Sequence, residues 1–211
     1  MKKAASLIEL VIAIVIMGIA VMTLPMMLNQ TLKNNEFTLH QEVLLAARTK
    51  LGDILTYRWD ENSLINDRIV VLPVTNGDSE LDPSDEIRRI GHIYAYKRRK
   101  FDLTNNASTT FGDANVTDID DFHGKTSILD GIEANLDYRF TDLNMTTTVT
   151  YISDNANYND ENLSFTFETN TSTPSTNIKM ITLETTAVDT TFTLRAYSAN
   201  IGESELLRRP Y

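Results

Sequence analysis

The stretch KKAASLIELVIAIVIMGIAVMTLPMML, residues 2–28, decides the fold of this chain. Two lysines open it, and the nineteen residues from Leu10 to Leu28 carry no charge. An uncharged helix of that length is long enough to cross a bilayer. A single carboxylate, Glu9, stands just before the uncharged block. Because an ionised carboxylate in hydrocarbon is costly, Glu9 is expected to have a partner and a function.

Three ordinary interpretations of this stretch compete. A secretory signal peptide has an apolar core of roughly 7–15 residues followed by small residues. This block is longer and ends in Leu-Pro-Met-Met, residues 24–27. A plain signal anchor explains the lysines and the length but not Glu9. The uncharged length argues against a buried helix of a soluble domain. The two lysines predict a cytoplasmic N-terminus, with everything after Leu28 outside.

The run Ser6-Leu7-Ile8-Glu9-Leu10 resembles the start of type IV pilins and pseudopilins. That resemblance implies cleavage by a prepilin peptidase between Ala4 and Ala5, which makes Glu9 the fifth residue of the mature chain. Ala4 is a small residue where the family usually has Gly. Ala5 stands where the family usually has Phe, so the resemblance leaves methylation of the new amino terminus open.

Residues 5–57 are predicted to form one long helix with two halves. After a leader at 1–4, residues 5–28 form the membrane or filament-core half, and residues 29–58 form an amphipathic half. Gly18 and Pro25 interrupt the membrane half, and Pro25 predicts a kink because proline removes a backbone donor. In pilins, a Gly and a Pro at similar places mark a segment that can melt during assembly.

Beyond Leu28 the apolar residues recur at helical spacing, which predicts one face that covers a core. The residues of this stripe are Leu32, Leu39, Val43, Ala46, Ala47, Leu51, Ile54 and Leu55. Trp59, the only tryptophan, is expected at the junction between the helix and the head, with no ligand role.

Residues 59–202 are predicted to form a β-rich head, so the fold class is α+β with a mostly antiparallel sheet. Short strands are expected within residues 68–74 and around residues 92–96. Two hairpins are expected, with turns at 142–144 and at 188–190, and alternation over residues 163–167 predicts a further strand. Residues 203–211 form a polar tail.

The composition limits the partners. The formal charge is −10, and loss of two lysines with the leader would make it −12. An acidic chain is not expected to bind nucleic acid, and the basic run at residues 97–100 is expected to pair with the acidic excess. Cysteine is absent, so stability must come from the core, from helix packing or from neighbouring subunits.

An acidic segment in the head is a candidate calcium site, because Ca²⁺ prefers six to eight oxygen ligands. Its spacing is not that of an EF-hand loop, and a loop that caps itself through Asx turns is the competing interpretation. The candidate ligands are Asp113, Asn115, Asp118, Asp120 and Asp121.

No Ser–His–Asp, Cys–His or histidine-rich metal pattern is present in the sequence, and no Gly-rich phosphate loop. The chain is therefore expected to be the substrate of an enzyme and not an enzyme. The resemblance implies a subunit of a type IV pilus or a type II secretion filament. The large head, the lack of a disulfide loop, and a C-terminal half (residues 193–202 above all) that resembles minor pilins favour a minor pilin or pseudopilin over the major subunit. Its partners would be the prepilin peptidase, other subunits, the inner-membrane assembly platform and membrane lipid. The alternative is a monomeric, single-pass membrane-anchored adhesin or binding domain.

Overall fold

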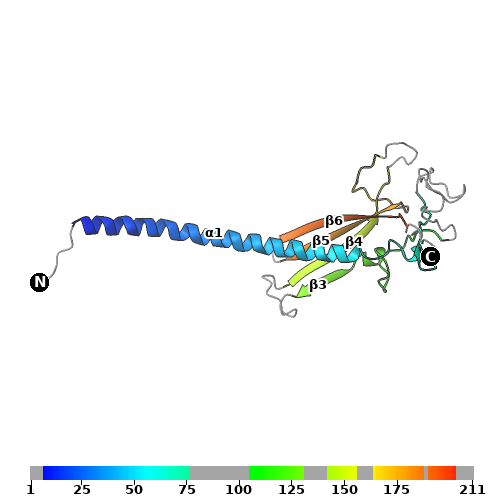
Figure 1. The fold of residues 1–211 in the computed structure, drawn as a ribbon, viewed down its shortest axis with the longest axis horizontal. Helices are drawn as coiled ribbons and strands as arrows, with labels where there is room; N and C mark the ends of the chain where they lie inside the picture. Colours follow the sequence, from blue (N-terminus) through cyan, green and yellow to red (C-terminus); the bar gives the residue numbers. More distant parts are fainter. Residues whose placement is uncertain (1–6, 77–104, 131–141, 156–163, 188–189, 203–211) are drawn as a thin grey trace, which may run out of the picture.

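The computed structural model describes residues 7–76, 105–130, 142–155, 164–187 and 190–202. It consists of one long N-terminal helix and an antiparallel sheet that packs on the C-terminal half of that helix (Figure 1). The predicted α+β fold class is confirmed.

Helix α1 spans Leu7–Ile54, 48 residues, and is about 72 Å long at 1.5 Å per residue. It passes through Gly18 and Pro25 as one continuous helix, and Figure 1 shows gentle curvature and no sharp bend. The sharp kink that was predicted at Pro25 is therefore not seen. The proline removes one backbone donor, but the helix continues unbroken.

The C-terminal half of α1 covers one face of the sheet. Val43, Ala47, Leu51 and Ile54 are buried there at spacings of four, four and three residues. Leu39 and Ala46 are partly buried against the same core. The predicted stripe is thus confirmed at its centre, whereas Leu32 and Leu55, at its ends, are exposed.

The sheet has the strand order β3-β4-β5-β6, and every neighbouring pair is antiparallel. Its strands are β3 (Thr126–Asp130), β4 (Asp142–Tyr151), β5 (Ile178–Ala187) and β6 (Thr190–Ala199). Side chains of β4 alternate between buried and exposed along the strand, as expected for a sheet that is covered on one face. The inner face of the sheet supplies six of the twelve buried residues of the main core cluster.

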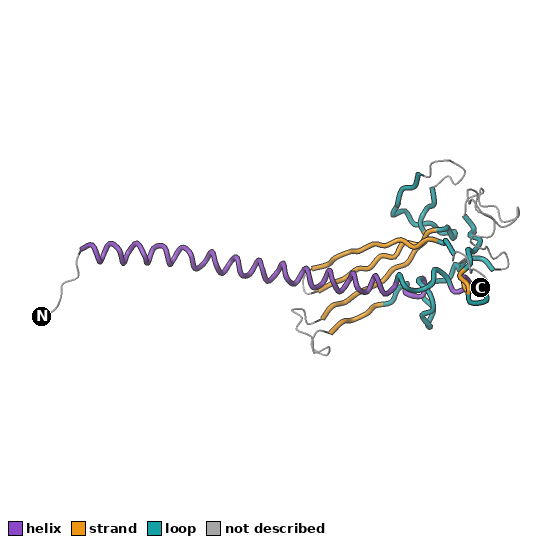
Figure 2. The backbone as a smooth tube through the Cα atoms, in the orientation of Figure 1, coloured by secondary structure: helices purple, strands orange, loops and turns teal. Residues whose placement is uncertain are grey.

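The connecting segments gather at the end of the sheet that lies away from the free half of α1 (Figure 2). In the described residues they contain two short 3-10 helices and one small hairpin: η1 (Glu61–Ser63), η4 (Asp120–Phe122), and β1 (Leu64–Ile65) paired with β2 (Arg68–Ile69). Asn66 and Asp67 form the hairpin turn with positive φ angles of 51° and 58°, a conformation that Asn and Asp tolerate better than most residues.

The structure agrees with some of the predictions for the head and differs from others. The hairpin around 188–190 is confirmed by the pairing of β5 with β6. The predicted turn at 142–144 is wrong, because these residues begin β4 and pair with β3 and β5. Residues 164–170 form no strand. The strand predicted within residues 68–74 is present as β2, and the one around residues 92–96 lies outside the described residues.

Candidate functional site

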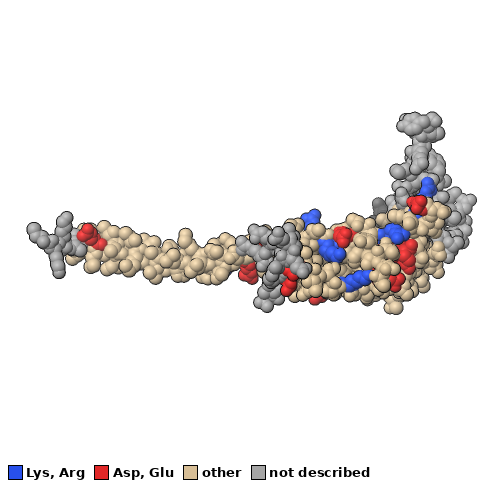
Figure 3. Space-filling view, turned by 90° about the horizontal axis from the view of Figure 1, so that it is seen from below, with Lys and Arg blue, Asp and Glu red and all other residues tan. Residues whose placement is uncertain are grey.

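The first functional feature is the surface of α1 outside the head. Every side chain from Leu7 to Phe37 is exposed. The most apolar eighteen-residue window of the helix has a mean hydropathy of 2.7, and none of its residues is buried within the chain. Figure 3 shows this half as a long surface almost free of charge. By length and composition it can cross a membrane, and a signal sequence would look the same.

The predicted assembly residues lie on this exposed half. Glu9 is in the first turn of α1 and is exposed, where the helix dipole favours a negative charge. A Cβ added at Gly18 would meet nothing within 4 Å, so packing within this chain does not require a glycine there. Pro25 is also exposed. Ala4 and Ala5 lie outside the described residues.

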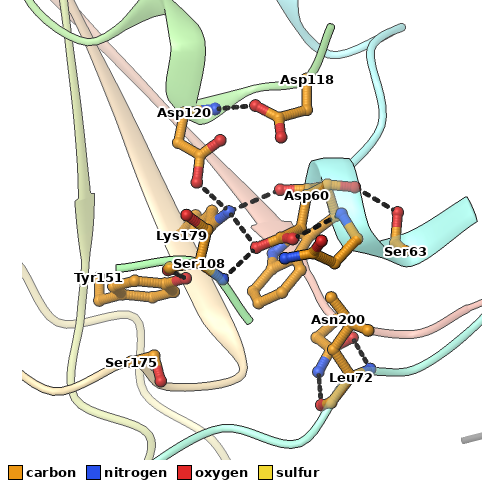
Figure 4. Close-up of polar contacts among 12 residues, drawn as sticks. Asp60, Ser63, Leu72, Ser108, Asp118, Asp120, Tyr151, Ser175, Lys179 and Asn200 are labelled. Atoms are coloured by element: carbon orange, nitrogen blue, oxygen red, sulfur yellow. Dashed lines mark hydrogen bonds and ion pairs between the residues drawn. The ribbon is translucent and has the colours of Figure 1, made fainter. Parts of the chain in front are cut away.

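The second feature is a buried polar cluster at the junction between α1 and the sheet, centred on Lys179 (Figure 4). Lys179 lies on β5, paired with Tyr151 of β4, and its side chain is fully buried. Its Nζ donates to the Asp120 carboxylate at 2.7 Å and to the Trp59 carbonyl at 2.7 Å. Asp60 Oδ2 lies 3.4 Å from the same nitrogen.

Two aromatic rings enclose the ammonium group of Lys179. Its Nζ lies 4.2 Å from the centroid of the Trp59 ring and 5.3 Å from that of Tyr151. Both distances suit a cation–π contact. Trp59 is buried at the junction, as predicted, and its carbonyl and ring both contact the lysine. The tryptophan thus helps to seal a charged site away from water.

Asp60 is fixed by backbone donors. It caps the N-terminus of η1, where its Oδ1 accepts from the amide of Asn62 at 3.0 Å. Its Oδ2 accepts from the amide of Ser108 at 2.8 Å. Because both oxygens are held, the carboxylate keeps one orientation toward Lys179.

The segment 117–121 holds three buried carboxylates in one short turn. Oδ1 of Asp118 accepts from the amides of Asp120 and Asp121, at 3.1 and 3.2 Å. Oδ2 of Asp121 accepts from the amides of Thr117 and Asp118, at 2.7 and 3.2 Å. This is the self-capping Asx pattern that competed with the calcium interpretation. Oδ2 of Asp118 is buried and has no hydrogen-bond partner.

Burial dominates the electrostatics of this cluster. It raises the pKa of Asp118 to about 7, with the neighbouring Asp120 carboxyl adding to the effect. Burial also raises the pKa of Asp60 and of Asp120, although the positive charge of Lys179 opposes the shift. At Asp121 burial is outweighed by the hydrogen bonds from Thr117 and Asp118, so its pKa is lowered.

The structure brings together only part of the predicted calcium set. Asp118, Asp120 and Asp121 have oxygens within 4.8 Å of one another, as do Asp60, Glu61 and Asp118. Asp113 belongs to neither group, and both Asp113 and Asn115 are exposed. Calcium binding stays a prediction. The Asp118 and Asp121 carboxylates also cap the turn through backbone amides. The Asp120 carboxylate also pairs with Lys179.

Sequence reasoning missed Lys179, Asp60 and Tyr151. Asp60 and Asp120 lie 119 and 59 residues from Lys179 in the chain, so no local pattern joins them. One signal was present: Lys179 interrupts the apolar run from Ile178 to Ile181. A charged residue at that place in a predicted strand indicates a buried partner of opposite charge.

The histidines do not converge on a metal site in the described part of the chain. His123 Nδ1 lies 2.7 Å from the Val149 carbonyl oxygen, and His40 Nε2 lies 3.3 Å from the Thr190 hydroxyl. No protein family, no curated protein and no solved structure matches the chain.

Proposed function

We propose that this chain is a structural subunit of a cell-envelope filament of the type IV pilin class, most similar in role to a minor pilin or pseudopilin. The observation that carries the proposal is the uncovered apolar half of α1, joined to a separately packed head. Apolar surface of this extent is unfavourable in water. A bilayer, and then the helices of neighbouring subunits, would cover it.

The first step of the proposed mechanism is processing. The leader is cut between Ala4 and Ala5 by a prepilin peptidase while the chain sits in the inner membrane. The N-terminus is then cytoplasmic, and the head lies on the outer side of that membrane. The two lysines of the leader support this orientation.

The second step is assembly on the inner-membrane platform. The new ammonium group of Ala5 pairs with the Glu9 carboxylate of a neighbouring subunit. In a low-dielectric surrounding an unpaired carboxylate is strongly disfavoured, so the pairing selects one axial register. Contacts between apolar helices supply most of the cohesion. The glycine at position 18 supports close approach of another helix, since nothing in its own chain fills that space.

Replacement of Glu9 tests the mechanism. We expect Glu9→Leu to insert into the membrane normally but to enter filaments at least tenfold less often, as measured by immunoblot of sheared filaments against the membrane fraction. Glu36→Leu is the matched control, because Glu36 is also exposed on α1 but lies beyond the uncharged block. Equal incorporation of the two variants would refute the pairing role of Glu9.

A second candidate function is a monomeric, membrane-anchored adhesin or binding domain. The length and hydropathy of α1 favour it as much as they favour a filament subunit. The two candidates differ in the amino terminus of the mature protein. A filament subunit begins at Ala5, whereas a signal anchor retains Lys2 and Lys3.

A further inference from the structure

The ion pair between Lys179 and Asp120 is short and completely enclosed by the head. Lys179 Nζ lies 2.7 Å from Asp120 Oδ2, and the two side chains are 0% and 2% exposed. Oδ2 is bonded directly to the carboxyl carbon, so the atom that the amine would attack is one covalent bond from the oxygen that the ammonium contacts. Reacting atoms held roughly 3–3.5 Å apart gain much of the advantage of an intramolecular reaction.

We propose that Lys179 and Asp120 become joined by a side-chain amide bond, which covalently links β5 to the η4 segment of the head. The proposal goes beyond the filament role and does not depend on it.

Asp60 is the third group that such a reaction needs. Its Oδ2 lies 3.4 Å from Lys179 Nζ, within reach for proton transfer as the atoms move together. Asp120 is the better electrophile of the two carboxyls because it is closer to the nitrogen. Asp60 is also held in place by the amides of Asn62 and Ser108, so it is assigned the role of proton carrier.

The surroundings favour the neutral product over the ion pair. The rings of Trp59 and Tyr151 flank the nitrogen, and the buried site excludes the water that would hydrolyse an amide. A buried ion pair carries a desolvation penalty that a neutral amide avoids. Burial also raises the pKa of the Asp60 and Asp120 carboxyls. Asp60 therefore takes up a proton from the ammonium more readily, and the departing oxygen of Asp120 is protonated more readily.

The reaction balances without a co-reactant. The Lys179 ammonium gives one proton to Asp60, and the neutral amine attacks the Asp120 carboxyl carbon. A bond forms between Nζ and that carbon, and one carbon–oxygen bond breaks. The departing oxygen takes up the proton from Asp60 and a second proton from the nitrogen, and leaves as water. An ammonium and a carboxylate thus become one amide and one water molecule, with no change in net charge.

A cross-link of this kind would do for this chain what a disulfide does in proteins that contain cysteine. The chain has no cysteine, yet Asp120 and Lys179 are 59 residues apart. Closing a loop of that length lowers the entropy of the unfolded chain. The bond would tie the start of β5, a central strand of the sheet, to the η4 segment.

Intact mass spectrometry of the denatured full-length protein tests the proposal. The wild-type chain is expected to be lighter than its sequence mass by one water molecule. Lys179→Arg and Asp120→Ala should each show the full sequence mass. The matched control is Lys50→Arg, because Lys50 and Asp53 form an exposed pair at 3.2 Å. That variant should still lose one water. A wild-type chain at its full sequence mass would overturn the proposal, even if the variants fail to fold.

Peptide mapping fixes the position of the bond. Trypsin should release a branched peptide that joins residues 101–125 to residues 140–195, since an acylated Lys179 is no longer a cleavage site. Asp60→Asn should retain the fold but accumulate the branched peptide at least tenfold more slowly after refolding. A branch at any other pair of residues would contradict the assignment of the bond. An unchanged rate in Asp60→Asn would show that Asp60 is not the proton carrier.

Discussion

Lys179 is fully buried, yet its ammonium group contacts two carboxylates and a backbone carbonyl from distant parts of the chain. The carboxyl groups of this cluster have shifted pKa values, and burial raises most of them. Asp118 is its least satisfied member, because it is buried, lies next to Asp120, and has one oxygen with no donor. A protonated Asp118 is easier to bury than a charged one.

The raised pKa of Asp118 predicts a pH dependence of stability. The pKa is about 7 in the folded chain against an ordinary value of 3.8, so the native state holds a proton that the unfolded state has released between these values. The free energy of unfolding should fall by on the order of a few kcal/mol as the pH rises from about 4 to 7. Asp60 and Asp120 shift in the same direction.

Asp118→Asn provides the control for this pH dependence. It keeps the acceptor for the amides of Asp120 and Asp121 but cannot titrate. Thermal unfolding followed across this range should give a clearly flatter profile for the variant. A profile as steep as that of the wild type would show that Asp118 is not the group responsible.

Gly202 is required by close packing and by its backbone angle. Its φ is +66°, and an added Cβ would lie 2.9 Å from Val71 Cγ2 and 3.0 Å from Val71 N. Gly202→Ala should therefore destabilise the head by about 1–3 kcal/mol, measured as a lower urea midpoint. Gly52→Ala is the comparison, since nothing lies within 4 Å and the site is helical. It should be neutral or raise stability by up to about 1 kcal/mol. Similar losses in both variants would contradict this explanation.

At the scale of elements, α1 has two halves with different surroundings. All of its core contacts come from Leu39 onward, and the residues from Leu7 to Phe37 are exposed. The periodicity of the sequence predicted both halves, because a helix that buries one face must repeat its apolar residues every three or four positions. The hairpin of β5 and β6 was predictable for the corresponding reason, from alternation.

Other elements could not be predicted from the sequence. Asp142 and Asn144 favour turns, yet they lie on the exposed face of β4, where polar residues are also expected. Phe165 and Phe167 alternate as in a strand, but they pack on each other and on Tyr197 instead of pairing with a neighbour. The partners of Lys179 come from distant segments, so only the fold brings them together.

The division of α1 predicts where the chain can be shortened. A chain that begins at Asn29 should be monomeric and soluble, with an unfolding temperature within a few degrees of that of the full-length protein. A chain that begins at Lys50 lacks Val43 and Ala47, which are 1% and 0% exposed in the core, and should not fold. Circular dichroism during heating would measure both. If the chain that begins at Asn29 were unfolded, the apolar half would have to support the head.

At the scale of the whole molecule, the protein is a rod with a head at one end (Figure 1). The head is closed by its own core, while the exposed half of the rod carries no charge from Leu10 to Leu28. This division suits a subunit that is held in a membrane and then packs its helix among other helices. The head would remain on the outside of such an assembly.

The amino-terminal mass of the chain recovered from sheared surface filaments of its native host distinguishes a processed filament subunit from an anchored monomer. We expect a chain that begins at Ala5 and that is present in the filament fraction. A chain that still carries Lys2 and Lys3, and that is found only as a monomer in the membrane fraction, would contradict this expectation.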